Sequence, residues 1–170
     1  MSDVLGGRST QPVARAAARV LLLDGRDRVL LFRGGDPGRP GSALYWFTVG
    51  GGLDPGESPR AGAVRETREE TGLRLAEDDL CGPVWHEVVE FPFEGQDYRQ
   101  TQDFFYARVE QAAEPGWAVD TSGFGPVEER SVDAHRWWSV AELAATRETY
   151  YPPDLVPLLR RVLAGEVSGP

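Results

Sequence analysis

Hydrophobic residues occur along this chain in short runs separated by turn-forming residues. The runs at 14–23 and 29–33 are rich in Val and Leu, and the segment 24–28 between them contains an Asp-Gly pair. This spacing predicts two strands of a hairpin. Residues 45–49 are largely aromatic and predict a third strand, which leads directly into three consecutive glycines.

The second half of the chain has the same character. Residues 84–91 and 102–109 predict two further strands, with a turn over residues 95–100. Residues 110–127 contain two Pro and three Gly with little periodicity, so we expect a long loop there. A last strand is predicted at 136–139.

Three segments have helical signals. Ser58 is a good N-cap, Pro59 suits the first helical position and Gly72 suits a left-handed terminating residue, so a helix is predicted over residues 59–71. Ser139 can cap a short helix over residues 140–146. The leucines and valines of 154–164 recur at helical spacing.

The order strands, helix, strands, helix predicts the α/β class, with a curved mixed sheet between helices. The chain has 170 residues, which suits one domain with a proper core. We expect a single domain over residues 13–165, with tails at 1–12 and 166–170.

Composition narrows the functional classes. The net charge of −9 disfavours binding to long nucleic acids, whose affinity depends on neutralising phosphates. No run approaches the roughly 20 apolar residues of a membrane span, and the N-terminus lacks the features of a signal peptide. Cys81 is the one cysteine, which excludes an intrachain disulfide. We therefore expect a cytoplasmic protein with no membrane partner.

The predicted helix over residues 59–71 concentrates negative charge. Glu66, Glu69 and Glu70 are spaced i, i+3 and i+4, which places three carboxylates on one face. The opposite face, free to pack against a core, carries Val64, Thr67 and Thr71. Like charges at this spacing are unfavourable, so we expect a cation to offset them.

The chemistry of this helix favours a metal site. Clustered carboxylate oxygens suit Mg²⁺, Mn²⁺ or Ca²⁺. The preceding run Gly50-Gly51-Gly52 lets backbone atoms approach a metal or a phosphate closely. Arg/Glu-rich helices are commonly just solvated surfaces, however, so composition alone does not separate the two interpretations.

The spacing of residues over the whole segment 51–73 distinguishes a metal site from a solvated charged helix. Residues 51–73 match the pattern G-x5-E-x7-R-E-U-x-E-E-x-G-U, where U is an aliphatic residue, and so resemble the Nudix hydrolase family. The one departure is Thr67, which replaces an aliphatic residue but is close to valine in shape. The matching positions are Gly51, Glu57, Arg65, Glu66, Glu69, Glu70, Gly72 and Leu73.

The resemblance implies an α/β/α sandwich and hydrolysis of a nucleoside diphosphate linked to another group, with Mg²⁺ or Mn²⁺. On this basis Glu66, Glu69 and Glu70 are the predicted metal ligands, and a backbone carbonyl at Gly50 or Gly51 completes the set. Glu66 and Glu70 are both candidates for the base that acts through a bound water. The family's further substrate motifs are not evident, so the nucleotide stays open.

Several further residues are candidates for the site. Glu57 and Arg65 are expected to pair and pin the glycine loop to the helix, the alternative being two separate solvated charges. Members of the family recruit one more carboxylate from a late loop, where Glu128 and Glu129 lie, and Glu129 is favoured. The predicted substrate-binding residues are Arg19, Arg33, Trp117 and Phe124.

Two other functions stay open. The fold could serve a module that senses a nucleotide without turnover, although such a module has no need for all four glutamates. An isopentenyl diphosphate isomerase would need a well-placed cysteine, and Cys81 falls in a polar connector. A homodimer and a monomer are both compatible with the sequence.

Overall fold

The computed structural model describes residues 11–167, so the two predicted tails lie largely outside the described residues. Seven strands form one sheet with the order β4-β5-β1-β2-β3-β7, and β6 pairs with β2. The strands are β1 Val13–Asp24, β2 Val29–Gly34, β3 Tyr45–Gly52, β4 Cys81–Phe93, β5 Gln96–Val109, β6 Val132–Trp138 and β7 Tyr150–Tyr151. The helices are α1 Pro59–Thr71, α2 Pro126–Ser131, α3 Val140–Ala145 and α4 Leu155–Leu163, with 3₁₀ turns at Glu77–Asp79 and Glu110–Ala113.

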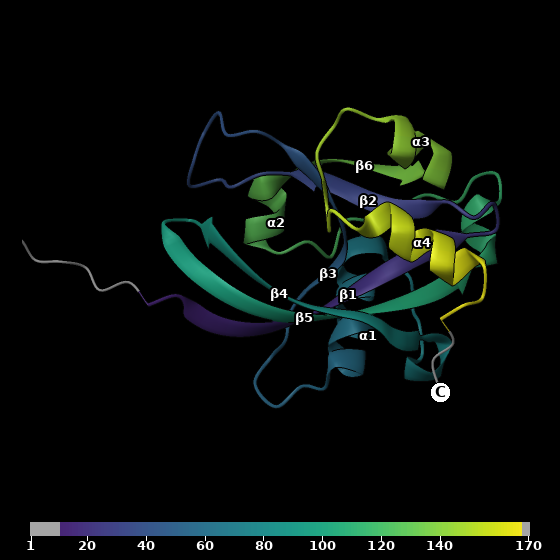
Figure 1. Ribbon diagram of the computed structural model, residues 1–170, viewed down its shortest axis with the longest axis horizontal. Coiled ribbons are helices and arrows are strands. Elements are labelled where there is room, and N and C mark those ends of the chain that lie inside the picture. The colour runs from purple at the N-terminus through teal and green to yellow at the C-terminus, as the bar shows by residue number, and fades with distance from the viewer. Residues whose placement is uncertain (1–10, 168–170) are drawn as a thin grey trace, which may run out of the picture.

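The sheet curves between two helical layers, with α1 against one face and α3 and α4 against the other (Figure 1). Because side chains alternate along a strand, β1 supplies both cores. Val20 and Leu22 pack in the cluster that contains Ala63 of α1, and Leu21 and Leu23 pack in the cluster that contains α4. The predicted α/β/α sandwich with a curved mixed sheet is confirmed.

β1 is the central strand. It pairs with β5 in parallel over twelve positions, from Val13 opposite Tyr98 to Asp24 opposite Val109. Its other edge pairs antiparallel with β2 at the hairpin end and with β3 at the glycines. The first hairpin therefore forms as predicted, and β1 places the glycines of β3 next to the face that carries α1.

Three details of the second half differ from the sequence prediction. The turn predicted at residues 95–100 is wrong, because β4 and β5 pair as far as Phe93 opposite Gln96. Glu94 and Gly95 make the turn, both with positive φ (49° and 79°), and such two-residue loops match the twist of the strands they join. The long loop is shorter than predicted because α2 begins at Pro126, and the strand β7 was not predicted.

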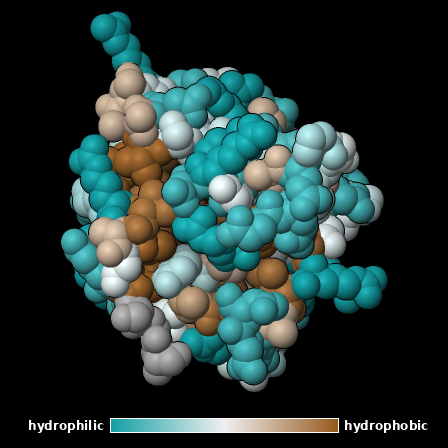
Figure 2. Space-filling view, turned by 90° about the vertical axis from the view of Figure 1, so that its right-hand side faces the viewer, coloured by the Kyte–Doolittle hydropathy of each residue, from teal (hydrophilic) through white to brown (hydrophobic). Residues whose placement is uncertain are grey.

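The outer surface is mostly hydrophilic on the side shown in Figure 2, with a strip of hydrophobic residues along one margin. No helix within residues 11–167 combines the length and the apolar character needed to cross a membrane. The helices α1 and α4 each bury one face against the sheet. In α4 this face consists of Leu155, Val156, Leu158, Leu159 and Val162.

Candidate active site

The helix α1 forms where the sequence predicts it and for the predicted reasons. The hydroxyl of Ser58 accepts a hydrogen bond from the amide of Ala61 at 3.1 Å, and Pro59 occupies the first turn. Gly72 ends the helix in the left-handed conformation, with φ of 77°. Thr67 and Thr71 are buried on the packing face, which fixes the rotation of the helix and turns its glutamates toward the glycines.

The three glycines lie at the end of β3, beside that acidic face. Gly50 has φ of +122°, a conformation that side chains rarely adopt, and its amide donates to Oε2 of Glu70 at 2.8 Å. A Cβ at Gly51 would lie 2.8 Å from Oε1 of Glu66. Side-chain atoms are therefore excluded at the place where the two carboxylates approach the strand.

Burial sets the protonation of these two carboxyls. Glu70 is 6% exposed, and burial raises the pKa of its carboxyl from an ordinary value of 4.5 to about 8, although the Gly50 amide opposes that shift. Burial also raises the pKa of Glu66, against the lowering effect of Arg65. Two carboxyls held this close in a poorly solvated place favour a cation between or beside them.

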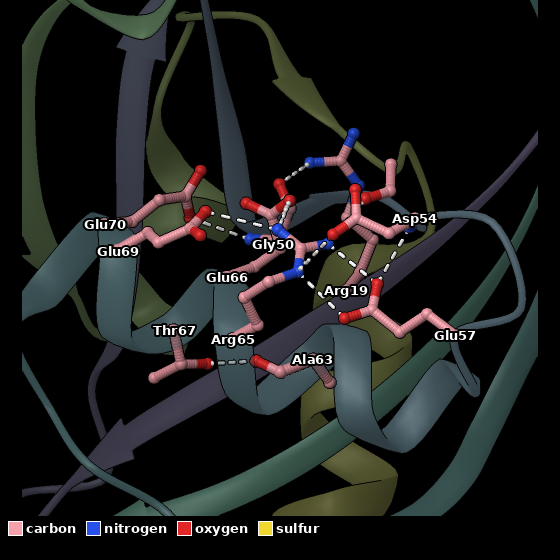
Figure 3. A network of polar contacts seen from close by, with 11 residues as sticks. Arg19, Gly50, Asp54, Glu57, Ala63, Arg65, Glu66, Thr67, Glu69 and Glu70 are labelled. Atoms are coloured by element: carbon pink, nitrogen blue, oxygen red, sulfur yellow. Dashed lines mark hydrogen bonds and ion pairs between the residues drawn. The ribbon is translucent and has the colours of Figure 1, made fainter. Parts of the chain in front are cut away.

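Arg65 is the centre of the polar contacts in Figure 3. Its guanidinium makes two hydrogen bonds of 2.8 Å to Glu57, one of 2.9 Å to the carbonyl of Gly52 and one of 2.9 Å to Glu66. A longer bond of 3.2 Å reaches Glu69. The hydrogen bonds to Arg65 lower the pKa of Glu57 to about 2. The expected pair of Glu57 and Arg65 is thus present, and it fastens the glycine segment to α1.

The carboxylates partly meet the needs of a divalent cation. Glu66 and Glu70 border the glycines, whereas Glu69 is 46% exposed and bonds to Arg65. Within the described part of the chain, no three acidic, His or Cys side chains already converge on one point. The all-oxygen donor set, the missing Cβ at Gly51 and the buried carboxyl groups of Glu66 and Glu70 fit a hard cation such as Mg²⁺.

The two candidates for a further carboxylate late in the chain lie on a helix. Glu128 and Glu129 both lie in the first turn of α2, not in the expected loop end. Glu128 is half-buried and its charge contributes to the raised pKa of Glu70, while Glu129 is exposed. Of these two carboxylates, Glu128 is therefore the one whose charge influences Glu70.

The two predicted substrate arginines already bond to the protein. Arg19 donates to the carbonyl of Gly50 at 2.7 Å and to Oε1 of Gln102 at 3.2 Å. Arg33 makes a two-point ion pair with Asp133, with distances of 2.9 and 3.0 Å. Arg19 is consequently next to the glycines, whereas Arg33 lies on the β2–β6 pair.

The two predicted substrate aromatics pack against the α1-side core. The rings of Trp117 and Trp137 are 6.1 Å apart, and those of Phe124 and Phe32 are 5.7 Å apart. Phe124 also borders a cavity of about 130 Å³ together with His135 of β6. Of the two, Phe124 is the one beside a space that a ligand could enter.

Sequence reasoning missed the anchors of Arg19. Gln102 and Glu87 connect Arg19 to β5 and β4, but they lie 83 and 68 positions along the chain from it. Only the strand register reveals this connection, because Gln102 and Glu87 are direct partners in the β4–β5 ladder. The alternation of Arg15, Ala17 and Arg19 on one face of β1 was the single local signal.

Comparison with known proteins identifies the family and the fold. The family model for the NUDIX domain matches residues 13–161, and the chain therefore belongs to the Nudix family. Among solved structures, a MutT protein from Methanosarcina mazei Go1 is 18% identical with a TM-score of 0.60, covering 93% of this chain and 99% of that one.

Two other solved structures are similar over nearly the whole chain. A C. elegans Ap4A hydrolase in a binary complex is 18% identical with a TM-score of 0.55, covering 89% of this chain and 97% of that one. The E. coli dihydroneopterin triphosphate pyrophosphohydrolase is 16% identical with a TM-score of 0.59, covering 90% of this chain and 99% of that one. At these identities the likeness concerns the fold.

Proposed function

We propose that the protein is a Mg²⁺-dependent pyrophosphohydrolase, with Mn²⁺ as a substitute, that acts on a nucleoside diphosphate linked to another group. Nucleoside triphosphates, ADP-ribose and nucleotide sugars are the candidate substrates. The observation that carries the proposal is the placement of Glu66 and Glu70 against the side-chain-free glycines of β3. Arg65 and Glu57 hold the two segments together at this point.

Glu66, Glu69 and Glu70 would hold the metal, with a backbone oxygen at Gly51 and a carboxylate of α2. When bound, the metal would neutralise phosphate charge and make a coordinated water more acidic. A water molecule would attack one phosphorus through its oxygen, the anhydride P–O bond would break, and the leaving phosphate would take the electron pair. Glu66 or Glu70 would accept the proton of the attacking water.

Arg15 is the arginine best placed to contact a substrate phosphate. Its Nη2 atom lies 3.3 Å from the position of a Cβ at Gly52, and Glu66 is close enough to influence the pKa of its guanidinium. No salt bridge to Arg15 is found within residues 11–167. The other proposed substrate contacts are Arg33, Trp117 and Phe124.

The test is a hydrolysis screen with Mg²⁺ and with Mn²⁺, in which products are identified by mass. The panel contains nucleoside triphosphates, ADP-ribose, nucleotide sugars, Ap4A and dihydroneopterin triphosphate. Metal-dependent release of a nucleoside or pterin monophosphate or diphosphate supports the proposal. Glu69→Gln and Glu70→Gln should each remove most of the activity without unfolding the protein, while Glu114→Gln, at an exposed site, should not.

Other outcomes would replace the proposal. Tight binding of a panel compound that stays intact after long incubation with metal would indicate a nucleotide-sensing module. Interconversion of the two isoprenoid diphosphates would indicate an isomerase. The structure does not favour the isomerase, because Cys81 lies in the β4–β5 ladder opposite Tyr106, away from Glu66 and Glu70 on α1.

A dimer and a monomer both remain compatible with this chemistry. The aromatic residues near the tip of the β4–β5 hairpin, including the stacked rings of Phe91 and Tyr98 at 5.8 Å, are the surface we propose for a homodimer. Sedimentation of the purified protein over a range of concentrations would decide between the two states.

A further inference from the structure

The backbone of Gly50 is held from two directions by the side chains of Glu70 and Arg19. Its amide donates to Glu70 of α1 at 2.8 Å, and its carbonyl accepts from Nη1 of Arg19 on β1 at 2.7 Å. Arg19 and Gly50 are direct partners in the β1–β3 ladder. Gly50 has an unusual φ of +122°. The orientation of its N–H and C=O groups therefore depends on these two contacts more strongly than the orientation of an ordinary strand residue depends on its side-chain contacts.

Arg19 is itself anchored across the sheet. Its Nε atom donates to Oε1 of Gln102 at 3.2 Å, and Nε2 of Gln102 donates to Glu87 at 2.6 Å. Gln100 donates to the same Oε1 of Gln102 at 2.7 Å. The chain of contacts therefore runs from β4 through β5 and β1 to the glycines of β3.

The direction of each bond in this chain is determined by chemistry. A guanidinium can only donate and an ionised carboxylate can only accept. The amide of Gln102 must therefore turn its oxygen toward Arg19 and its nitrogen toward Glu87. Gln102 is only 8% exposed, so the Arg19–Gln102 contact is protected from competing water.

We propose that Arg19 is a positioning residue, which Gln102 and Glu87 hold in place so that it fixes the Gly50 peptide beside Glu70. For its kinetic consequence this inference rests on the proposed hydrolase function. Loss of the contact lets the Gly50 peptide move relative to the carboxylates, and displacements of about 1 Å at a reacting centre can cost on the order of 100-fold in rate. Direct binding of substrate by Arg19 is the rival role, because no hydrogen bond from its Nη2 atom is found within residues 11–167.

The kinetic experiment separates these roles. Using the substrate found in the screen, Arg19→Gln should lower kcat by about 10- to 100-fold with KM changed less than about threefold. Gln102→Leu, which leaves Arg19 in place but removes its anchor, should lower kcat by a smaller factor with the same unchanged KM. Arg19→Lys should recover part of the loss, since an ammonium can reach the Gly50 carbonyl but cannot also bond to Gln102.

The matched control is Arg161→Gln, which removes an exposed arginine of α4 and should leave both constants as in the wild type. A rise in KM with unchanged kcat in Arg19→Gln would overturn the inference in favour of substrate binding. Wild-type kcat in both Arg19→Gln and Gln102→Leu would overturn it outright. Where Arg19→Gln fails to fold, Gln102→Leu decides.

A second measurement needs no substrate. The exchange rate of the Gly50 amide hydrogen, followed by NMR in the metal-free protein, should rise at least about tenfold in Arg19→Gln and in Gln102→Leu. Amides in α4, such as that of Leu159, should keep their wild-type rates. A uniform increase across α4 would indicate general destabilisation and would contradict a positioning role. This result stands even when no compound in the panel is hydrolysed, so a wrong substrate class and a wrong role for Arg19 are distinguishable.

Discussion

Replacing Gly50 and Gly51 separately by alanine tests two different requirements of the candidate site, the backbone conformation of β3 and the position of the Glu66 carboxylate. An alanine methyl at Gly51 would lie 2.8 Å from Oε1 and 3.0 Å from Oε2 of Glu66, whereas ordinary contacts begin at 3.4 Å. The carboxylate must therefore retreat by about 0.6 Å or more. Because it is the end of a flexible side chain, this retreat should change the free energy of unfolding by less than about 1 kcal/mol.

The same methyl at Gly50 meets a rigid neighbour. It would collide with the backbone carbonyl of Ala18, and φ of +122° adds strain of about 1–3 kcal/mol for an alanine. Gly50→Ala should thus lose stability, while Gly51→Ala should keep its stability and lose activity. From the displacement of Glu66 we expect a loss of up to about 100-fold in kcat/KM for Gly51→Ala.

The assays are urea unfolding of the metal-free protein and metal-dependent hydrolysis at saturating and subsaturating substrate. Wild-type activity in Gly51→Ala would refute the placement of Glu66 as a residue whose position matters for the reaction. A loss of stability in Gly51→Ala as large as that in Gly50→Ala would refute the geometric argument itself.

Three further predictions concern the same helix. The pKa of Glu57 is lowered to about 2, so its pair with Arg65 contributes stability that is present above pH 4.5 and is lost between about pH 4.5 and 2. Urea unfolding over this pH range should show a smaller loss of the free energy of unfolding in Glu57→Gln than in the wild type. The pKa of Glu70 is raised to about 8, so the metal-free protein should lose stability as the pH rises from 4.5 to 8. In urea unfolding at pH 8 with a chelator, Glu70→Gln should be more stable than the wild type. Thr67→Val should change the free energy of unfolding by less than about 1 kcal/mol, because the hydroxyl only bonds back to the Ala63 carbonyl within the helix, and its activity should equal that of the wild type.

The helix of the site was predictable because its determinants are local. Ser58, Pro59 and Gly72 act within one turn of the helix ends, and all three behave as expected. The pairing of Glu57 with Arg65 was also predictable, since the family pattern places both residues next to the same glycine segment. Signals of this kind do not depend on the rest of the fold.

The choice between Glu128 and Glu129 was not predictable in the same way. Neighbouring residues on a helix point about 100° apart, so the rotation of α2 decides which carboxylate lies toward Glu70. That rotation depends on how Pro126–Ser131 packs before β6, and the Gly- and Pro-rich sequence ahead of it gave no periodicity from which to infer a helix.

The extent of the β4–β5 hairpin was likewise a property of pairing. Residues 96–100 contain Asp, Tyr, Arg and Gln and have little strand character alone. All five nevertheless pair with β4, and residues 98–100 also pair with β1. Being between two strands overrides local propensity. The same pairing brings Gln102 to Arg19 across 83 positions of sequence.

The position of β1 also has a consequence for how the chain reaches its native state. Among the strands of residues 11–167, β1 comes first in the sequence, but its parallel pairing with β5 starts with Val13 opposite Tyr98, which is 85 positions later. Until Val109 has been made, one edge of this largely apolar strand has no native partner. Non-local parallel pairing of this kind is slow, so the period of greatest exposure to aggregation falls during synthesis and early folding. A nascent chain that stops at Leu73 would contain every residue of the family pattern and still lack the strand that completes its central ladder.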